Sequence, residues 1–264
     1  MVIPIHDDNP VRRVPIVTYV LIALNFLVFF TEPVVSHIGG SQTVVQVCQQ
    51  QAYFDKYAAI PRELTTGHQL RFVPDGEVGH DTRGNVGCVE TRPSYKKAPY
   101  VSVLFSMFLH GGWLHILGNM LFLWVFGNNV EDRMGRLKFL LFYIFCGYVA
   151  AYGFAFGSPD ATTSLVGASG AIAGVLGAYL VIFPRARVTT LIPLAIVLIP
   201  LRLPAWAVLG GWFLLQWVYS SGAAVASGAG VAYLAHVYGF IAGLVIALLA
   251  RRALSQGTSV TAVA

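Results

Sequence analysis

Charged side chains are scarce in this chain of 264 residues. Asp, Glu, Lys and Arg together make up 11% of the sequence, whereas hydrophobic residues make up 56%. The mean hydropathy is +0.67. Soluble domains carry roughly 25% charged residues, so this composition cannot supply the surface of a water-soluble protein. Low charge also argues against an intrinsically disordered chain. The composition predicts an integral membrane protein.

Cysteine is scarce as well, and the three cysteines form no C-x-x-C or Cys/His cluster. A structural zinc site is therefore not expected. His110 and His115 are five residues apart, which misses the four-residue spacing of metal ligands on a helix. The 17 Lys and Arg residues are scattered along the chain, so nucleic acid is not expected as a partner.

Stretches without Asp, Glu, Lys or Arg that reach about 17–25 residues are candidate membrane helices. The sequence holds six, at 14–30, 105–130, 139–157 and 164–183, with two more inside the uncharged stretch 203–250. Small residues at 220–230 separate spans five and six and are expected to form a mobile cap. The stretch 188–201 is short and contains Pro193 and Pro200, so we expect an interfacial segment leading into span five.

Six spans place the clusters of Arg and Lys that flank them on one side of the membrane, which the positive-inside rule identifies as the cytoplasm. These clusters lie at 12–13, 133–138, 185–187 and 251–252. The predicted organisation is a cytoplasmic N-terminal segment (1–13), a membrane domain (14–252) with a long external loop (31–104), and a cytoplasmic C-terminal tail (253–264). Span one lacks the features of a cleaved signal peptide and is expected to be retained.

Polar side chains inside a membrane are costly, so each one is a candidate for function. Spans two, four and six run in the same direction, and each carries its polar residues near its beginning. These residues are His110, His115 and Asn119 in span two, Ser169 in span four and His236 in span six. His115 and Asn119 are four residues apart and share one helix face.

A serine next to an imidazole can act as a nucleophile, because the imidazole accepts the hydroxyl proton. His and Asn donors can stabilise the oxyanion that forms. Spans four to six contain no Asp or Glu, so the carboxylate that orients the histidine of a triad is absent, and a serine hydrolase with this sequence would use a dyad.

Small residues recur at four-residue intervals in spans four and six, which lets membrane helices approach closely. They are Gly170, Gly174 and Ala178 in span four and Ala235, Gly239 and Gly243 in span six. Taken singly, Ser169 also fits helix packing, His236 an interhelical hydrogen bond and Asn119 a helix contact. Their coincidence at one level of three helices favours a catalytic site.

Four motifs together resemble the rhomboid intramembrane serine proteases. They are His110-Gly-Gly-Trp-Leu-His115-Ile-Leu-Gly-Asn119, Glu131-Asp-Arg133-Met-Gly, Gly167-Ala-Ser169-Gly170 and Ala235-His236-Val-Tyr-Gly239. The resemblance extends over all six predicted spans. It implies an all-α membrane protein, a six-transmembrane-helix rhomboid-like bundle with the long external loop between helices one and two.

The resemblance also implies the roles of the residues. Ser169 would be the nucleophile and His236 the general base and acid of a dyad. His115 and Asn119, with the Ser169 backbone N–H, would form the oxyanion hole. Gly167, Gly170 and Gly239 would be structural, and Glu131 and Arg133 would form an ion pair. No cofactor is implied.

Two departures from the family pattern stand out. The external loop has no Trp-Arg pair. Ala173 occupies the position, one turn after the serine, where many members place an aromatic residue that stacks on the catalytic histidine. The His236 ring must then be supported by Tyr238 or by an aromatic residue on another span.

The expected function is hydrolysis of peptide bonds in or next to the transmembrane segments of membrane proteins, by a serine endopeptidase in a bacterial inner membrane. A non-enzymatic rhomboid-like protein that binds transmembrane helices would lack the serine or the histidine, and both are present. A small-molecule transporter would favour inverted repeats and charges at the midplane of the membrane, and neither is visible.

Cys48 and Cys88 lie in the external loop, on the oxidising side of the membrane. Cys146 falls within span three and is expected to be a buried thiol. The two loop cysteines are therefore expected to form a disulfide, with two free thiols as the alternative.

Overall fold

The computed structural model describes residues 3–33, 43–80, 84–194, 197–221 and 232–256. Most of the segment 220–230, which the sequence predicts to be a mobile cap, lies outside these residues. The chain divides into two compact units. The first comprises Met1–Ile22, Met120–Ala150 and Gly170–Ala264, and the second comprises Ala23–Asn119 and Ala151–Ser169.

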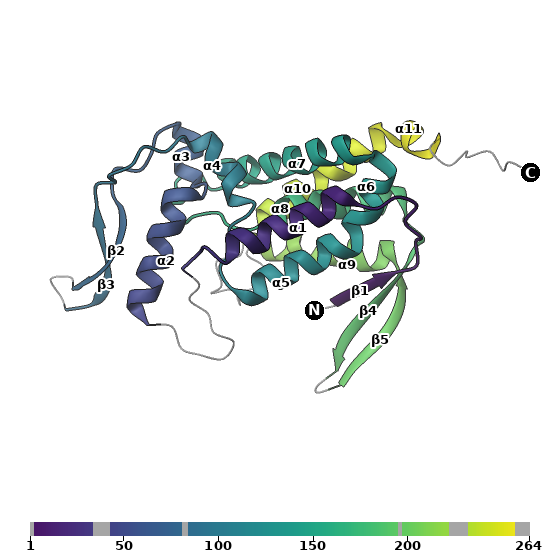
Figure 1. Cartoon of the computed structure of the whole chain (residues 1–264), viewed down its shortest axis with the longest axis horizontal. Coiled ribbons are helices and arrows are strands. Elements are labelled where there is room, and N and C mark those ends of the chain that lie inside the picture. The colour runs from purple at the N-terminus through teal and green to yellow at the C-terminus, as the bar shows by residue number, and fades with distance from the viewer. Residues whose placement is uncertain (1–2, 34–42, 81–83, 195–196, 222–231, 257–264) are drawn as a thin grey trace, which may run out of the picture. The chain divides into compact units, whose positions relative to one another are not determined.

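Each predicted span contains a helix (Figure 1). These helices are α1 (Ile16–Phe29), α5 (Trp113–Phe122) continued by the π-helix η1 (Leu123–Gly127) and α6 (Asn128–Met134), α7 (Arg136–Gly157), α8 (Ser169–Ile182), α9 (Ala205–Ser220) and α10 (Tyr233–Leu249). Among the described helices, α7 alone is both long and apolar enough to cross a membrane, while α1, α8 and α10 are apolar but shorter. The count of six spans stays a prediction.

Two of these helices begin later than the sequence predicts. Helix α4 (Pro99–Ser106) ends before the predicted polar part of span two, and α5 begins only at Trp113. His110 therefore lies in the connection between α4 and α5. Likewise, α8 begins at Ser169, so the serine is the first residue of its helix. Gly167 has a φ of +116°, which is incompatible with a helix. Helix α8 therefore cannot include Gly167 and begins after it.

The expectation of an all-α protein is wrong in two places, and the first is the sheet formed by β1 (Ile3–Asp7), β4 (Arg187–Leu194) and β5 (Val197–Pro204). The strands are antiparallel and their order is β1-β4-β5 (Figure 1). The predicted interfacial segment 188–201 is thus the main part of a β-hairpin. Its β-branched residues suit a strand, and its two prolines exclude a helix. A short helix, α11 (Arg251–Gln256), follows α10.

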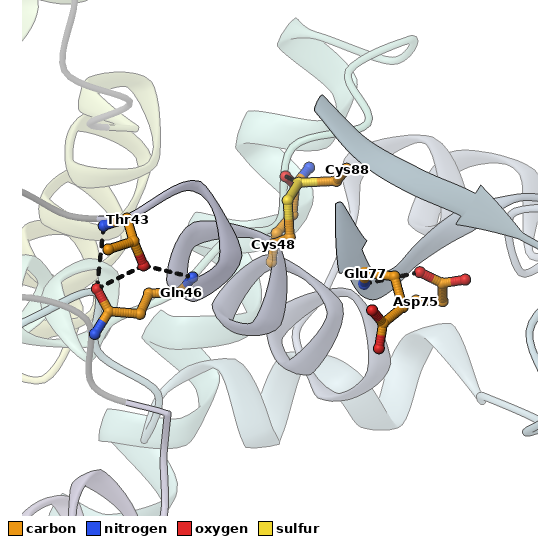
Figure 2. The surroundings of a disulfide bond; sticks show 7 residues. Thr43, Gln46, Cys48, Asp75, Glu77 and Cys88 are labelled. Atoms are coloured by element: carbon orange, nitrogen blue, oxygen red, sulfur yellow. Dashed lines mark hydrogen bonds between the residues drawn. A yellow bond between two sulfur atoms is a disulfide. The ribbon is translucent and has the colours of Figure 1, made fainter. Parts of the chain in front are cut away.

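The second departure is the external loop, which has secondary structure of its own. It contains α2 (Val44–Tyr57), α3 (Pro61–Thr66) and the antiparallel pair β2 (Val73–His80) and β3 (Val86–Thr91). A disulfide between Cys48 and Cys88 joins α2 to β3 (Figure 2). Thr43 and Gln46 cap the start of α2 reciprocally. Cys146 in α7 is a buried free thiol.

This loop is bonded to the segment that leads to Ser169. The Leu165 N–H donates to the Ala59 carbonyl at 2.7 Å. The Ser164 hydroxyl donates to the Asp55 carboxylate. A buried ion pair, with 2.7 Å between Lys97 Nζ and Glu63 Oε2, secures α3 to the segment before α4. The first two contacts join the residues before α8 to the external loop.

Two buried carboxylates hold the N-terminal segment within the first unit. Glu131 accepts hydrogen bonds from the N–H groups of Val17 and Thr18, at 3.0 and 2.7 Å, and so satisfies donors at the start of α1 that have no intrahelical partner. Asp7 accepts from the hydroxyl of Tyr179 and from the amide of Asn129, at 2.5 and 2.8 Å. Burial raises the pKa of Asp7 above its ordinary value.

The ion pair expected between Glu131 and Arg133 is absent from the described residues. The Glu131 carboxylate is directed to α1 instead, and the Arg133 guanidinium lies 5.0 Å from the centre of the Phe183 ring. The turn after span two therefore has a structural role: Glu131 caps α1, and Arg133 makes a cation–π contact.

Helices α8 and α10 approach so closely that only glycine fits at the contact. A Cβ atom on Gly239 would overlap the main-chain carbonyl of Gly170, and one on Gly243 would overlap that of Gly174. The faces of small residues that the sequence analysis identified in spans four and six are the faces that meet here.

The end of α1 carries a third buried carboxylate, Glu32, which belongs to the second unit. The backbone N–H of His110 donates to both of its oxygens, at 3.1 and 3.2 Å. Burial is the main cause that raises the pKa of Glu32 from 4.5 to about 8, against the lowering effect of the His110 N–H. Glu32 therefore anchors the connection before α5.

Replacing Glu32 should change how stability depends on pH. Because the folded state holds this proton more tightly than the unfolded chain, the free energy of unfolding should fall as pH rises from about 4.5 to 8. Glu32→Gln keeps an acceptor but does not titrate. The stability of the variant and of the wild type is compared by thermal unfolding in detergent. The difference, variant minus wild type, should be more positive at about pH 8.5 than at about pH 5. The exposed Glu77→Gln serves as the control, and a pH-independent difference for Glu32→Gln would contradict the assignment.

The disulfide should be detectable in protein purified from membranes. Non-reducing mass spectrometry after alkylation should find Cys48 linked to Cys88, with Cys146 free. Cys48→Ala should destabilise the external loop by up to about 4 kcal/mol on the chain-entropy account, because the bridge closes a long loop. Cys146→Ala is the control and should leave the linkage unchanged. Alkylation of both loop cysteines without prior reduction would refute the bridge.

Candidate active site

His115 and Asn119 lie one turn apart on the same face of α5. The backbone N–H of Gly111 donates to His115 Nδ1 at 3.3 Å. A neutral imidazole that accepts at Nδ1 carries its proton on Nε2. The local fold thus leaves His115 Nε2 as a hydrogen-bond donor.

Gly167 lies against both side chains. A Cβ atom at this position would be 2.7 Å from His115 Nε2 and 3.5 Å from Asn119 Nδ2. The Gly167 N–H donates to the Ser106 carbonyl at 2.9 Å, which fixes the backbone there. Only glycine fits this place, because it combines a positive φ with the absence of a side chain. Two donors therefore converge on the backbone two residues before Ser169.

Asn119 is buried, and its Nδ2 group has no hydrogen-bond partner among the described residues. Buried amide groups without a partner are rare, because each costs about 1–3 kcal/mol. Behind His115, the buried ring of His110 packs edge-on at 5.1 Å between ring centroids. The two donors are thus held in place by packing while Asn119 Nδ2 remains available to a ligand.

Ser169 is the first residue of α8 and is partly buried. The N-terminus of a helix carries a partial positive charge, equivalent to roughly half an elementary charge. An anionic group that formed beside Ser169 would be stabilised by this end of the helix as well as by the donors of α5. In the second unit, the structure therefore gathers His115, Asn119 and Gly167 around the segment that ends at Ser169.

His236 lies on the first turn of α10, in the first unit, and has its own set of neighbours. Its Nδ1 is 2.7 Å from Gln216 Oε1 on α9. The ring of Trp212, one turn earlier on α9, lies at 5.8 Å between centroids with a 33° tilt. Tyr233 approaches edge-on at 6.4 Å.

Support for the His236 ring therefore comes from an aromatic residue on another predicted span. Tyr238, the other candidate from the sequence, is 38% exposed. Ala173 is fully buried in α8. Of the two expected sources of the ring contact, Tyr238 and an aromatic residue on another span, it is the second, Trp212, that supplies it.

The sequence patterns considered above do not identify Gln216 as a functional residue, because an uncharged amide is not the carboxylate that a triad requires. A signal was present, because Gln216 is the only Asn or Gln in the uncharged stretch 203–250. An amide oxygen can hold a histidine ring as a carboxylate can, but without a charge. Within the described residues, no group of three His, Cys, Asp or Glu side chains could hold a metal ion.

The sequence matches the family model described as Rhomboid domain over residues 97–253. The chain is 35% identical over 78 residues to a putative rhomboid protease, YdcA, of Bacillus subtilis (strain 168), covering 30% of this chain and 39% of that protein. It is 34% identical over 98 residues to Rhomboid-like protease 5 of Toxoplasma gondii, covering 36% of this chain and 11% of that protein.

Rhomboid protein 1, mitochondrial, of Saccharomyces cerevisiae (strain ATCC 204508 / S288c) is 34% identical over 93 residues, covering 33% of this chain and 27% of that protein. The chain thus matches between 11% and 39% of the length of these three relatives. The resemblance stated from the motifs is confirmed by the family model, which covers more than half of the chain. This protein belongs to the rhomboid family of integral membrane proteins.

Proposed function

We propose that this protein is an intramembrane serine endopeptidase that hydrolyses peptide bonds in or next to the transmembrane segments of membrane proteins. The observation that carries the proposal is the convergence of His115 Nε2 and the unpartnered Asn119 Nδ2 on Gly167, two residues before Ser169. Donors aimed at one place beside a serine are what an oxyanion hole requires. The relatives in Bacillus subtilis and Toxoplasma gondii are named putative rhomboid protease YdcA and Rhomboid-like protease 5, which supports the same reaction.

In the proposed mechanism, Ser169 and His236 form a dyad. His236 Nε2 accepts the hydroxyl proton while Ser169 Oγ attacks the carbonyl carbon of the substrate. The oxyanion receives hydrogen bonds from His115 Nε2, Asn119 Nδ2 and the Ser169 N–H. As the C–N bond breaks, His236 returns the proton to the leaving amine, and an acyl-enzyme remains. Water, activated by the same histidine, then releases the second product.

The packing of α8 on α10 supports the dyad. Gly170, which follows Ser169 in the chain, contacts Gly239, which lies one turn after His236. A larger residue at Gly239 would overlap the Gly170 carbonyl and separate the two helices, whereas one at Gly170 would overlap Ala150 of α7. Gly167, Gly170 and Gly239 are therefore assigned structural roles. In the case of Gly167, a side chain would displace the donors of the oxyanion hole, His115 and Asn119.

The proposal includes six spans with both termini in the cytoplasm. Residues 1–13 and 253–264 are then cytoplasmic, and residues 14–252 form the membrane domain with its external insert at 31–104. The compartment is a bacterial inner membrane, and the partners are membrane-protein substrates and the lipid bilayer. The presence of both Ser169 and His236 favours this enzyme over a non-catalytic member that only binds transmembrane helices.

Removing either member of the dyad should abolish activity. Ser169→Ala and His236→Ala should each reduce cleavage of a model transmembrane substrate to background, while the protein stays folded and inserted. The matched controls are Ser158→Ala and His68→Ala, which should cleave normally. Full activity of Ser169→Ala, or loss of wild-type activity with a zinc chelator, would overturn the serine mechanism.

Asn119 should act in the transition state rather than in binding. Asn119→Ala should lower kcat about 10- to 1000-fold with little change in KM, because one oxyanion donor contributes up to about 4 kcal/mol. Asn119→Asp keeps the size but replaces the Nδ2 donor with an acceptor, so it should lose at least as much. Unchanged kcat with a raised KM would show that Asn119 is a substrate-binding residue.

A further inference from the structure

Gln216 occupies an unusual place on α9. The buried residues of this helix are Ala205, Leu209 and Gln216. Its neighbours Leu215 and Trp217 are 47% and 53% exposed, whereas Gln216 is 7% exposed. Burying an amide in an apolar helix is costly unless the amide is hydrogen-bonded. Gln216 therefore points into the protein for a polar contact, and that contact is His236.

We propose that Gln216 is the positioning residue of His236: its amide oxygen holds the histidine in the orientation and the tautomer in which Nε2 is unprotonated and can accept the proton of Ser169. The proposal rests on the proposed function, because it assigns a role within the same dyad. In this role Gln216 acts on the reaction only through His236. It acts through the 2.7 Å contact between its Oε1 and His236 Nδ1.

The chemistry of the two groups sets the direction of the hydrogen bond. An amide oxygen only accepts, so His236 Nδ1 must carry a proton to bond with it. In the neutral ring the second nitrogen, Nε2, is then unprotonated and can act as a base. Without Gln216 the ring is free to take the opposite tautomer, in which Nε2 is protonated and cannot accept a proton from serine.

Trp212 completes the support from the same helix. Trp212 and Gln216 are four residues apart on α9 and so share one face. The indole lies against the His236 ring at 5.8 Å, and the amide fixes the position of Nδ1. Together they restrict both the tilt of the ring and its rotation. In this chain, α9 thus supplies what a carboxylate supplies in a Ser-His-Asp triad, except for the negative charge.

Because Gln216 carries no charge, introducing a charge at this position should shift the pH profile of the reaction, which a purely structural hydrogen bond would not do. A carboxylate at this position would stabilise the protonated imidazole, whereas an amide does so weakly. Gln216→Glu keeps the acceptor and the shape while it adds this charge. Gln216→Leu removes the acceptor but keeps a side chain of similar size.

The experiment measures cleavage of a model transmembrane substrate by the full chain in detergent between about pH 5 and 9. Gln216→Leu should lower kcat about 10- to 100-fold with KM nearly unchanged, since misorientation of a catalytic group costs on this order. Gln216→Glu should keep most of its activity, and the midpoint of the acid limb of its pH profile should move to higher pH. Leu215→Ala, at an exposed neighbouring position on α9, is the control and should keep the wild-type kcat and profile.

A second measurement reports the tautomer without any catalysis. In the Ser169→Ala background, the ¹⁵N chemical shifts of His236, assigned by their loss in His236→Ala, should show a protonated Nδ1 at a pH where the ring is neutral. Adding Gln216→Leu should move the signals toward the Nε2-protonated form. Melting temperatures of all variants identify any that fail to fold.

Two outcomes would overturn the proposal: an unchanged kcat and pH profile in folded Gln216→Leu, or unchanged ¹⁵N shifts when Gln216 is replaced. Failure of the proposed function looks different, because the wild type would then not cleave the substrate, or Ser169→Ala would cleave it normally. The tautomer measurement would still decide whether Gln216 sets the state of the His236 ring.

Discussion

The need to satisfy every polar group buried in an apolar bundle is the constraint on which this structure depends. Glu131 caps the start of α1, and Glu32 accepts the His110 N–H. Gln216 contacts His236 in the same way. Each partnered group fixes the position of a segment. Asn119 Nδ2 differs from these, since it is buried without a partner and adjoins the Nε2 donor of His115. In the proposed mechanism, this unpaired donor gains a hydrogen bond when the oxyanion forms.

Much of the arrangement could be predicted from the sequence because charge and side-chain size are local properties. Runs without charge located a helix in each predicted span, and the four-residue spacing of glycines in α8 and α10 identified the faces that meet. Other features depend on the backbone and on distant partners. The start of α8 at Ser169 follows from the positive φ of Gly167. The hairpin of β4 and β5 pairs with the distant β1, and hydropathy alone could not distinguish it from an interfacial segment.

The candidate site shows the same division. Its residue types could be proposed from the sequence, because a serine, two histidines and an asparagine occur at one level of three apolar helices, although each of them alone also fits helix packing. The supporting residues could not be found in that way. Trp212 and Gln216 resemble ordinary helix residues until the packing of α9 on α10 brings them to His236. The contacts of the external loop could not be predicted either. Asp55 and Ala59 form hydrogen bonds with the segment before Ser169, and these bonds join residues about one hundred positions apart.

Covalent labelling tests the central claim, a nucleophilic serine at the start of α8, most directly. A fluorophosphonate reacts with a serine only where a base activates the hydroxyl and an oxyanion hole stabilises the product. Applied to the full chain in membranes and followed by peptide mass spectrometry, the probe should modify Ser169, and the modification should disappear in His236→Ala. A preparation that cleaves a transmembrane substrate while Ser169 remains unmodified, or while another residue carries the label, would contradict the account.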